Sequence, residues 1–236
     1  MADSAGPVKR FYDTASVETG AEGFRVLLDL RSVRTPARNI VAVPTEGLAD
    51  ASAGEWNAQA ERVDPRSMPL TGLANAAIDR VAPDSEAFAR ALAAYGESDL
   101  LCYRSEGPAS LVARQAASWD PILTWARQRY DVGFEVTSGI VHRPQPPQTV
   151  ERLAAAVAAR PPFELAALSP LVTISGSLII ALALAEAAID LDEAWSAAAL
   201  DELWQIETWG EDEEALRSLD SRRREFEAAW RFLSLL

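Results

Sequence analysis

A long apolar segment, LVTISGSLIIALALAEAAI at residues 171–189, limits what this chain can fold into. The segment is about as long as a bilayer span requires, but the polar sequence SGS lies inside it and Glu186 lies near its end. Its flanks are acidic, whereas basic flanks are typical of membrane helices. A helix that is apolar on every side and stays out of a membrane must be enclosed by other elements. The segment therefore predicts one fully buried central helix and no membrane insertion.

The net charge of the chain narrows the choice of partners. The 236 residues carry a formal charge of −13, so the chain lacks the basic surface that nucleic acids and anionic membranes require. A single cysteine, Cys102, excludes an internal disulfide, and we expect it to be a small buried residue. His142 is the only histidine, so the chain offers few soft metal ligands.

The first third of the chain reads as a small sheet with helices. FRVLLDL and NIVAVP are short strand-like runs separated by the turn RSVRTP. Thr45 is placed to cap a helix through EGLADASAGEWNAQAERV, which Trp56 would pack on the sheet, and Thr71 is placed to open a second helix, TGLANAAIDRV. We predict a two-layer α/β domain over residues 1–82, with a short antiparallel sheet.

From Pro83 onward the pattern is almost entirely helical. PDSEAFARALAAYGE and PPQTVERLAAAVAAR read as helices, and VGFEVTSGIV reads as a short extended connection. PASLVARQAASWDPILTWARQRYD contains Asp120 and Pro121, which predict two helices or one kinked helix. Residues 83–236 are therefore expected to form a mainly helical bundle domain, and the chain belongs to the α+β class.

Signatures of catalysis and of cofactor binding are missing from the sequence. Lys9 is the only lysine and no glycine-rich phosphate loop precedes it. His142 lies in a proline-rich connection without an adjacent nucleophile motif, and GEDEE lacks the alternating spacing of a calcium loop. The N-terminus shows neither a secretory signal nor a transit peptide. We expect no catalytic residue, no cofactor, no metal and a bacterial cytoplasmic location.

The most unusual segment is LWQIETWGEDEEA at residues 203–215, which sets two tryptophans among five acids. If residues 191–210 form one helix, Glu207 ends an apolar stripe that contains Leu200, Leu203 and Trp204. The last helix presents a seam of Leu216, Leu219, Arg223, Phe226, Trp230 and Leu233, in which Arg223 is the single charged member. Three roles follow for Glu207: a buried ion pair with Arg223, a docking residue, or an acid/base group.

The distribution of charge favours docking among these three roles. Residues 186–236 carry fourteen acids and five arginines, which is most of the negative charge of the chain. Solvated helix faces often carry such runs, but interleaved tryptophans are the anchor type that protein interfaces prefer. The candidate partner-binding residues are Trp204, Glu207, Trp209, Gly210, Glu211, Asp212 and Arg223.

Several motifs together resemble one family. KRFY, LDLRSVRTP, EWNAQAERVDPRSMPLTGLANAAIDRV, SDLLCYR, RQAASWDPILTWA, SGSLIIALALAE and DELWQIETWGEDEEA are similar to the Atp12 family, assembly chaperones for the F1 sector of ATP synthase. The resemblance covers nearly the whole chain. VRTP departs modestly from the expected Leu-Lys-Thr-Pro, and arginine replaces lysine almost throughout.

The resemblance implies a function without catalysis. It implies a bacterial relative of mitochondrial matrix proteins that bind the free F1 α subunit until the α/β hexamer forms, built from a small α/β domain and a helical bundle. Such a chaperone covers an apolar interface that would otherwise aggregate, and we expect it to act as a monomer. The alternatives are an enzyme that uses Glu207 as a general acid/base in a cleft between domains, and a structural subunit of a stable complex.

Overall fold

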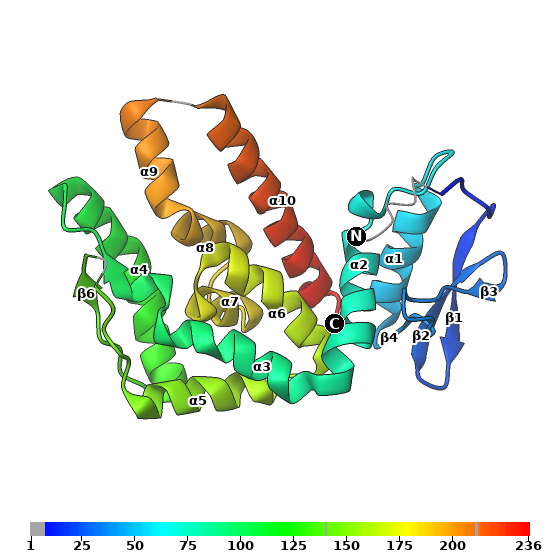
Figure 1. Ribbon diagram of the computed structural model, residues 1–236, viewed down its shortest axis with the longest axis horizontal. Coiled ribbons are helices and arrows are strands. Elements are labelled where there is room, and N and C mark those ends of the chain that lie inside the picture. Colours follow the sequence, from blue (N-terminus) through cyan, green and yellow to red (C-terminus); the bar gives the residue numbers. More distant parts are fainter. Residues whose placement is uncertain (1–7, 140, 211) are drawn as a thin grey trace, which may run out of the picture.

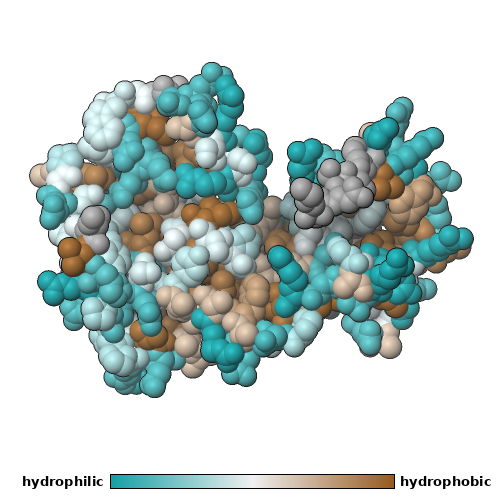
Figure 2. All heavy atoms as spheres, in the orientation of Figure 1, coloured by the Kyte–Doolittle hydropathy of each residue, from teal (hydrophilic) through white to brown (hydrophobic). Residues whose placement is uncertain are grey.

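The computed structural model describes residues 8–139, 141–210 and 212–236. Figure 1 shows a small part with a sheet and two helices at one end and a larger, helical part at the other. The predicted α+β class is confirmed, with a small antiparallel sheet before a mostly helical region. On the face shown in Figure 2, hydrophilic residues alternate with smaller groups of hydrophobic residues.

The sheet is a meander around one central strand. β1 (Ala15–Gly20) pairs antiparallel with β2 (Gly23–Leu28) along its full length. β3 (Arg31–Ser32) pairs with the end of β2, and β4 (Ala42–Val43) pairs with its beginning. The β2–β3 hairpin turns through two residues with positive φ, which is the geometry of a tight two-residue hairpin turn.

One helix packs on the sheet, and a second helix packs against the first. α1 (Glu46–Asn57) begins where predicted, because the Thr45 hydroxyl accepts a hydrogen bond from the backbone of Leu48. It ends earlier than predicted, since the Asn57 amide side chain donates to and accepts from the backbone of Ala15 on β1. α2 (Pro69–Ala76) begins two residues before the predicted start, because proline is accepted in the first turn of a helix.

The smaller part has its own apolar core, which also reaches the helical part. Val26 and Val43 of the sheet are buried against Leu48 of α1. Ala167 and Phe232, from two helices far along the chain, complete this core. The smaller part is therefore packed against the bundle through α6 (Pro162–Ser175) and α10 (Glu213–Ser234), which supply these two residues. The division at residue 82 stays a prediction.

Over its described residues, the larger part contains eight α-helices. They are α3 (Ser85–Ala93), α4 (Ala109–Tyr130), α5 (Pro147–Ala158), α6 (Pro162–Ser175), α7 (Leu178–Ala185), α8 (Leu191–Ala198), α9 (Leu200–Trp209) and α10 (Glu213–Ser234). A π turn and a 3-10 turn join α2 to α3, and Asp84 leaves helical geometry before α3 begins. The connection predicted to be extended contains β6 (Thr137–Ser138), which pairs parallel with β5 (Tyr103–Arg104).

α4 is a single helix that continues through Pro121. Of the two predicted forms, separate helices are therefore wrong. Asp120 does not cap a new helix; its carboxylate accepts a hydrogen bond from Arg104 at 2.8 Å. Trp119 and Leu123 are buried before and after the proline, and the Trp119 indole donates to the backbone of Ala197. Packing on both sides holds the helix together where the proline removes one backbone donor.

The apolar segment is buried as predicted, but it forms two helices instead of one. α6 ends at Gly176, whose φ of 66° is left-handed, and Ser177 caps α7 by accepting from the backbone of Ile180. The buried carboxylate of Asp99 accepts from the Ser177 hydroxyl at 2.7 Å and from the Ile179 backbone at 2.9 Å. These bonds replace the helical hydrogen bonds that the break removes.

The sequence predicted that the apolar segment at residues 171–189 does not insert into a membrane. Over the described residues, none of the helices has both the length and the apolar character that crossing a bilayer demands.

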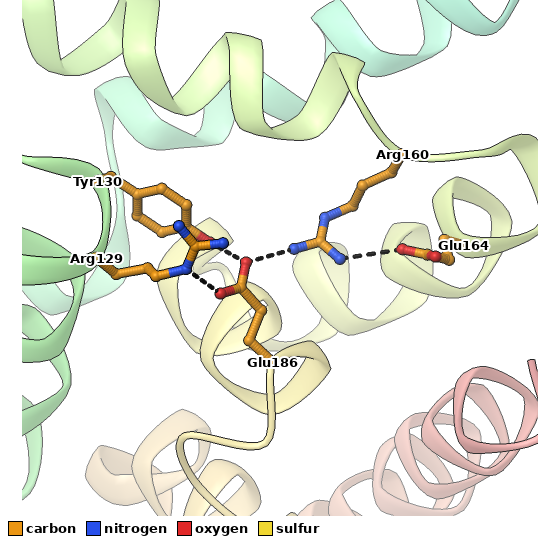
Figure 3. A network of polar contacts seen from close by, with 5 residues as sticks. All are labelled: Arg129, Tyr130, Arg160, Glu164 and Glu186. Atoms are coloured by element: carbon orange, nitrogen blue, oxygen red, sulfur yellow. Dashed lines mark hydrogen bonds and ion pairs between the residues drawn. The ribbon is translucent and has the colours of Figure 1, made fainter.

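A polar cluster around Glu186 joins three helices on the outside of this core (Figure 3). Glu186 follows α7 and accepts hydrogen bonds from Arg129 at 2.5 Å, from the Tyr130 hydroxyl at 2.7 Å and from Arg160 at 2.8 Å. Arg160 also pairs with Glu164 of α6 at 3.0 Å. Burial raises the pKa of Glu186, but the bonds from Tyr130 and Arg129 outweigh it, so the pKa lies below its ordinary value.

The surroundings of the single cysteine and the single histidine bear on whether either could act in catalysis. Cys102 is fully buried as predicted, and burial raises the pKa of its thiol to about 12. His142 is an exposed loop residue whose Nδ1 lies 3.0 Å from the Tyr103 hydroxyl. Neither residue has the surroundings of a catalytic group.

Candidate protein-docking site

α9 and α10 form a helical hairpin that extends beyond the rest of the bundle (Figure 1). The predicted continuous helix over residues 191–210 is wrong, because Ala199 leaves helical geometry and separates α8 from α9. Gly210 ends α9 with a φ of 95°, which suits glycine. Asp212 starts α10 by accepting hydrogen bonds from the backbones of Glu214 and Ala215.

A groove with a volume of about 380 Å³ runs between the two helices. The residues that line it are Glu202, Gln205, Ile206, Trp209, Gly210, Asp212, Ala215, Ser218, Leu219 and Arg222. Arg222 of α10 pairs with Glu202 of α9 at 2.7 Å and ties the helices together. The groove therefore has an apolar interior, a polar bridge and acidic side chains at its edge.

Trp209 is the most prominent side chain of this groove. It is 73 % exposed, although tryptophan is usually well covered in folded proteins. Its ring meets that of Trp204 edge to face, with centroids 5.6 Å apart, and Trp204 itself packs against the core of the bundle. Trp209 is thus a large exposed aromatic residue that packs against the partly buried Trp204. Residues of this type contribute most of the binding energy in many protein interfaces.

Glu207 is paired with Arg114 of α4. Its carboxylate oxygens lie 2.9 Å and 2.5 Å from the two terminal nitrogens of that guanidinium. Of the alternatives left open for Glu207, the ion pair with Arg223 is wrong: Arg223 binds Asp192 at 3.0 Å and Glu227 at 2.8 Å. The burial that this alternative required is absent, since the Glu207 side chain is 58 % exposed. Leu200, at the start of α9, is buried against the bundle core. Glu207 lies in the last turn of the same helix, beyond that core, and is therefore exposed.

The surroundings of Glu207 favour binding over acid/base chemistry. The hydrogen bond from Arg114 lowers the pKa of Glu207, so the carboxylate is charged near neutral pH. A general acid needs a raised pKa, and Glu207 also lies outside the lining of the groove. Among the described residues, no group of three or more acidic, histidine or cysteine side chains is arranged to hold a metal ion. The end of α9 therefore presents an exposed aromatic side chain beside charged carboxylates.

The structure gathers most of the predicted site residues, but not all of them. Trp209, Gly210 and Asp212 line the groove, Trp204 supports Trp209, and Glu207 lies on the outer flank of α9. Arg223 belongs to a separate set of ion pairs with α8. Glu211 lies outside the described residues.

Sequence reasoning missed the residues that complete the groove. On α9, Glu202, Ile206 and Trp209 share one face at helical spacing, and on α10 Leu219 and Arg222 do the same. This pattern was present in the sequence, rotated by about one residue from the stripe that ends at Glu207. Arg114 could not have been found in this way, because 93 positions separate it from Glu207.

Comparison with known proteins identifies the family. The family model described as "ATP12 chaperone protein" matches residues 9–127, which is half of the chain. The chain belongs to the ATP12 chaperone family. The resemblance seen in the sequence motifs is thereby confirmed.

Solved structures of relatives share the whole fold. Atp12 from Paracoccus denitrificans is 42 % identical, with a TM-score of 0.92 over 97 % of this chain and 98 % of that one. A putative chaperone from Agrobacterium tumefaciens is also 42 % identical, with a TM-score of 0.91 over 96 % of this chain and 85 % of that one. The mitochondrial protein atp12 of Schizosaccharomyces pombe is 24 % identical over 88 % of this chain and 75 % of its own length.

Proposed function

We propose that this chain is an assembly chaperone for the F1 sector of ATP synthase and binds the free F1 α subunit until the α/β hexamer forms. Membership of the ATP12 chaperone family supports this proposal. The observation that carries it is the groove between α9 and α10, in which Trp209 is exposed as an apolar anchor with acidic neighbours. A polar site with one large anchor suits a partner that must be released again.

The geometry suggests how the client is held. Trp209, supported by Trp204, would insert into the apolar surface that α later presents to its neighbours in the hexamer. Glu207 and the acids that follow Gly210 would meet basic groups at the edge of that surface and speed the encounter. Residues Trp204, Glu207, Trp209, Gly210, Glu211, Asp212 and Arg223 are the proposed contact set.

Release is proposed to occur by competition. The β subunit would cover the same surface of α with a larger contact, so the chaperone needs only moderate affinity. No nucleotide step is required for this exchange. We propose that the chaperone acts as a monomer in the bacterial cytoplasm.

The test is capture of α by the purified chain. The parent should retain co-expressed F1 α in soluble form, and Trp209→Ala should weaken binding roughly tenfold or more, as the loss of an interface anchor does. Trp209→Phe is the matched control, because it keeps an aromatic ring at the same place. A parent chain that fails to retain α would show that the proposed client is wrong.

The same measurement locates the surface. Trp209 is exposed, so its replacement should leave the midpoint of thermal unfolding nearly unchanged. A Trp209→Ala variant that is stable and binds α as the parent does would place the docking surface elsewhere.

A further inference from the structure

A second groove lies in the smaller part, beside the β2–β3 hairpin. Its volume is about 620 Å³. Leu28 and Val33 are buried beneath it, and Phe11 and Trp56 line it beside the β2–β3 hairpin. The groove thus combines an apolar lining with access from solvent.

Phe11 is exposed in a fixed position. Its side chain is 69 % exposed, yet its ring meets Tyr12 edge to face at 5.4 Å, and Tyr12 meets Trp56 in the same way at 5.6 Å. The Tyr12 hydroxyl donates to the backbone of Trp56 at 2.6 Å and fixes this row of rings. An ordered aromatic wall gives a contact surface at a small entropic cost on binding.

Leu30 is another exposed apolar residue, at the tip of the β2–β3 hairpin between the lining residues Asp29 and Arg31, although it is not itself part of the lining. It is 88 % exposed and has a φ of 71°, a left-handed conformation that glycine and asparagine adopt far more readily. Asp29, the other turn residue, accepts from the backbones of Asp13 and Thr14, which hold the tip of the hairpin in place. A strained leucine that buries almost none of its surface contributes little to folding, which points to a binding role.

The groove is lined by two arginines and one acid, Asp29, whose carboxylate already accepts hydrogen bonds from the backbones of Asp13 and Thr14. Arg31 and Arg34 line the groove, are exposed, and form no ion pair with any other described residue. Arg34 donates instead to the uncharged backbone carbonyl of Arg38 at 2.8 Å. Residues 8–44 contain six basic and four acidic side chains, in a chain whose net charge is −13. The groove is therefore suited to an acidic partner.

We propose that this N-terminal groove docks an acidic segment of the client, with an apolar side chain against Phe11, at the end of the groove that Leu30 flanks, and a carboxylate on Arg31 or Arg34. The inference rests on the proposed function and gives the chaperone a second contact with F1 α. Two separate contacts with one client raise the effective concentration at each site, so two sites of moderate affinity together hold the client firmly. When β displaces one contact, the other becomes weak enough to dissociate.

Leu30→Gly provides the sharpest variant. Glycine adopts a positive φ without strain, so the fold should be at least as stable as the parent, while the apolar contact is lost. The double variant Arg31→Glu/Arg34→Glu reverses the charge of the groove without touching its buried floor. Arg66→Glu is the matched control, because Arg66 is 93 % exposed in the same part of the chain and lies outside the groove.

The measurement is the affinity of each variant for purified, soluble F1 α at two salt concentrations. Leu30→Gly should weaken binding roughly fivefold, and Arg31→Glu/Arg34→Glu roughly tenfold with a smaller dependence on salt. Arg66→Glu should stay within about twofold of the parent. If both groove variants bind as the parent does, the inference is overturned and the proposed function stands. A parent that does not bind α overturns both.

A photo-activated cross-linking residue at position 11 identifies the occupant. We expect an adduct with a peptide of F1 α that contains several acids, and no adduct when the same residue replaces Arg66. Cross-links to a second copy of this chain, or to a peptide of α without acids, would overturn the inference.

Discussion

Arg114 on α4 holds both carboxylate oxygens of Glu207 on α9, at 2.9 Å and 2.5 Å. The pair joins the projecting α9–α10 hairpin to the body of the bundle at its outer flank. Both side chains remain substantially exposed, so solvent and salt screen their attraction. The pair is therefore better placed to orient the end of α9 than to stabilise the fold.

Glu207→Lys is expected to fold normally and to bind poorly. The urea midpoint should stay close to that of the parent, because an exposed pair contributes little to stability. Capture of F1 α should fall roughly tenfold, since an attractive contact is replaced by a repulsive one. Equilibrium unfolding in urea, measured beside capture of α, checks both parts.

The charge swap Arg114→Glu/Glu207→Arg is the control for this prediction. It restores the ion pair but not the carboxylate on α9, so capture should stay weak if Glu207 contacts the client. A swap that captures α as well as the parent would show that Glu207 only positions α9. An unfolded Glu207→Lys chain would contradict the exposed position of the pair.

Gly176→Ala should destabilise the chain through its backbone. The added methyl would meet only Leu100 at 4.0 Å, so space is available, but the φ of 66° is unfavourable for alanine. The expected loss in the free energy of unfolding is about 1–2 kcal/mol. Gly72→Ala, inside α2 and with no neighbour within 4 Å, should instead be neutral or stabilising. Equal urea midpoints for the two variants would be evidence against a backbone origin.

Asp99 should make stability depend on pH. Burial raises the pKa of Asp99 to about 6, against the bonds from Ile179 and Ser177 that lower it. The folded state therefore holds a proton that the unfolded state has already released, and stability falls as pH rises from about 4 to about 6. At about 1.4 kcal/mol per unit of pKa, this contribution amounts to roughly 3 kcal/mol.

Asp99→Asn isolates this contribution, because the amide does not titrate. The free energy of unfolding should be measured for parent and variant between pH 4 and pH 7, and the two curves subtracted so that other titrating groups cancel. The advantage of the parent should shrink across this range. If the difference in the free energy of unfolding between parent and variant is the same at every pH, the pKa of Asp99 is not raised in the folded state.

Glu186→Gln should cost more stability than Glu164→Gln. Glu186 accepts from Arg129, Tyr130 and Arg160, whereas Glu164 accepts only from Arg160 in the cluster of Figure 3. A glutamine at position 186 turns one acceptor into a donor that faces other donors, at an expected cost of about 1–3 kcal/mol. Urea unfolding of the two isosteric variants at pH 7 makes the comparison. Similar losses would indicate that Glu186 does not organise the cluster.

Local features of the fold could be read from the sequence because neighbouring residues determine them. The Thr45 cap and the β-strand pattern of FRVLLDL each depend on a few adjacent positions. The same holds for the burial of the long apolar segment, since a helix without a polar face must be covered. The motifs that resemble the family are local as well.

The breaks inside helical segments were harder to predict. The apolar segment is interrupted at Gly176 because Asp99, far away in the sequence, supplies hydrogen bonds to the new helix start. α4 continues through Pro121 because Trp119 and Leu123 are held by other helices. In both places a distant partner decides whether a weak local signal becomes a helix end.

The site shows the same division. The sequence by itself determined that aromatic anchors and acids are concentrated between residues 203 and 215, and that a glycine ends the helix there. Only the tertiary structure decided that Glu207 pairs with Arg114, that Arg223 pairs with α8, and that Trp209 faces a groove closed by α10. Helical periodicity specifies which residues share a face, but the partner of that face depends on how distant helices pack, and packing is a property of the whole chain.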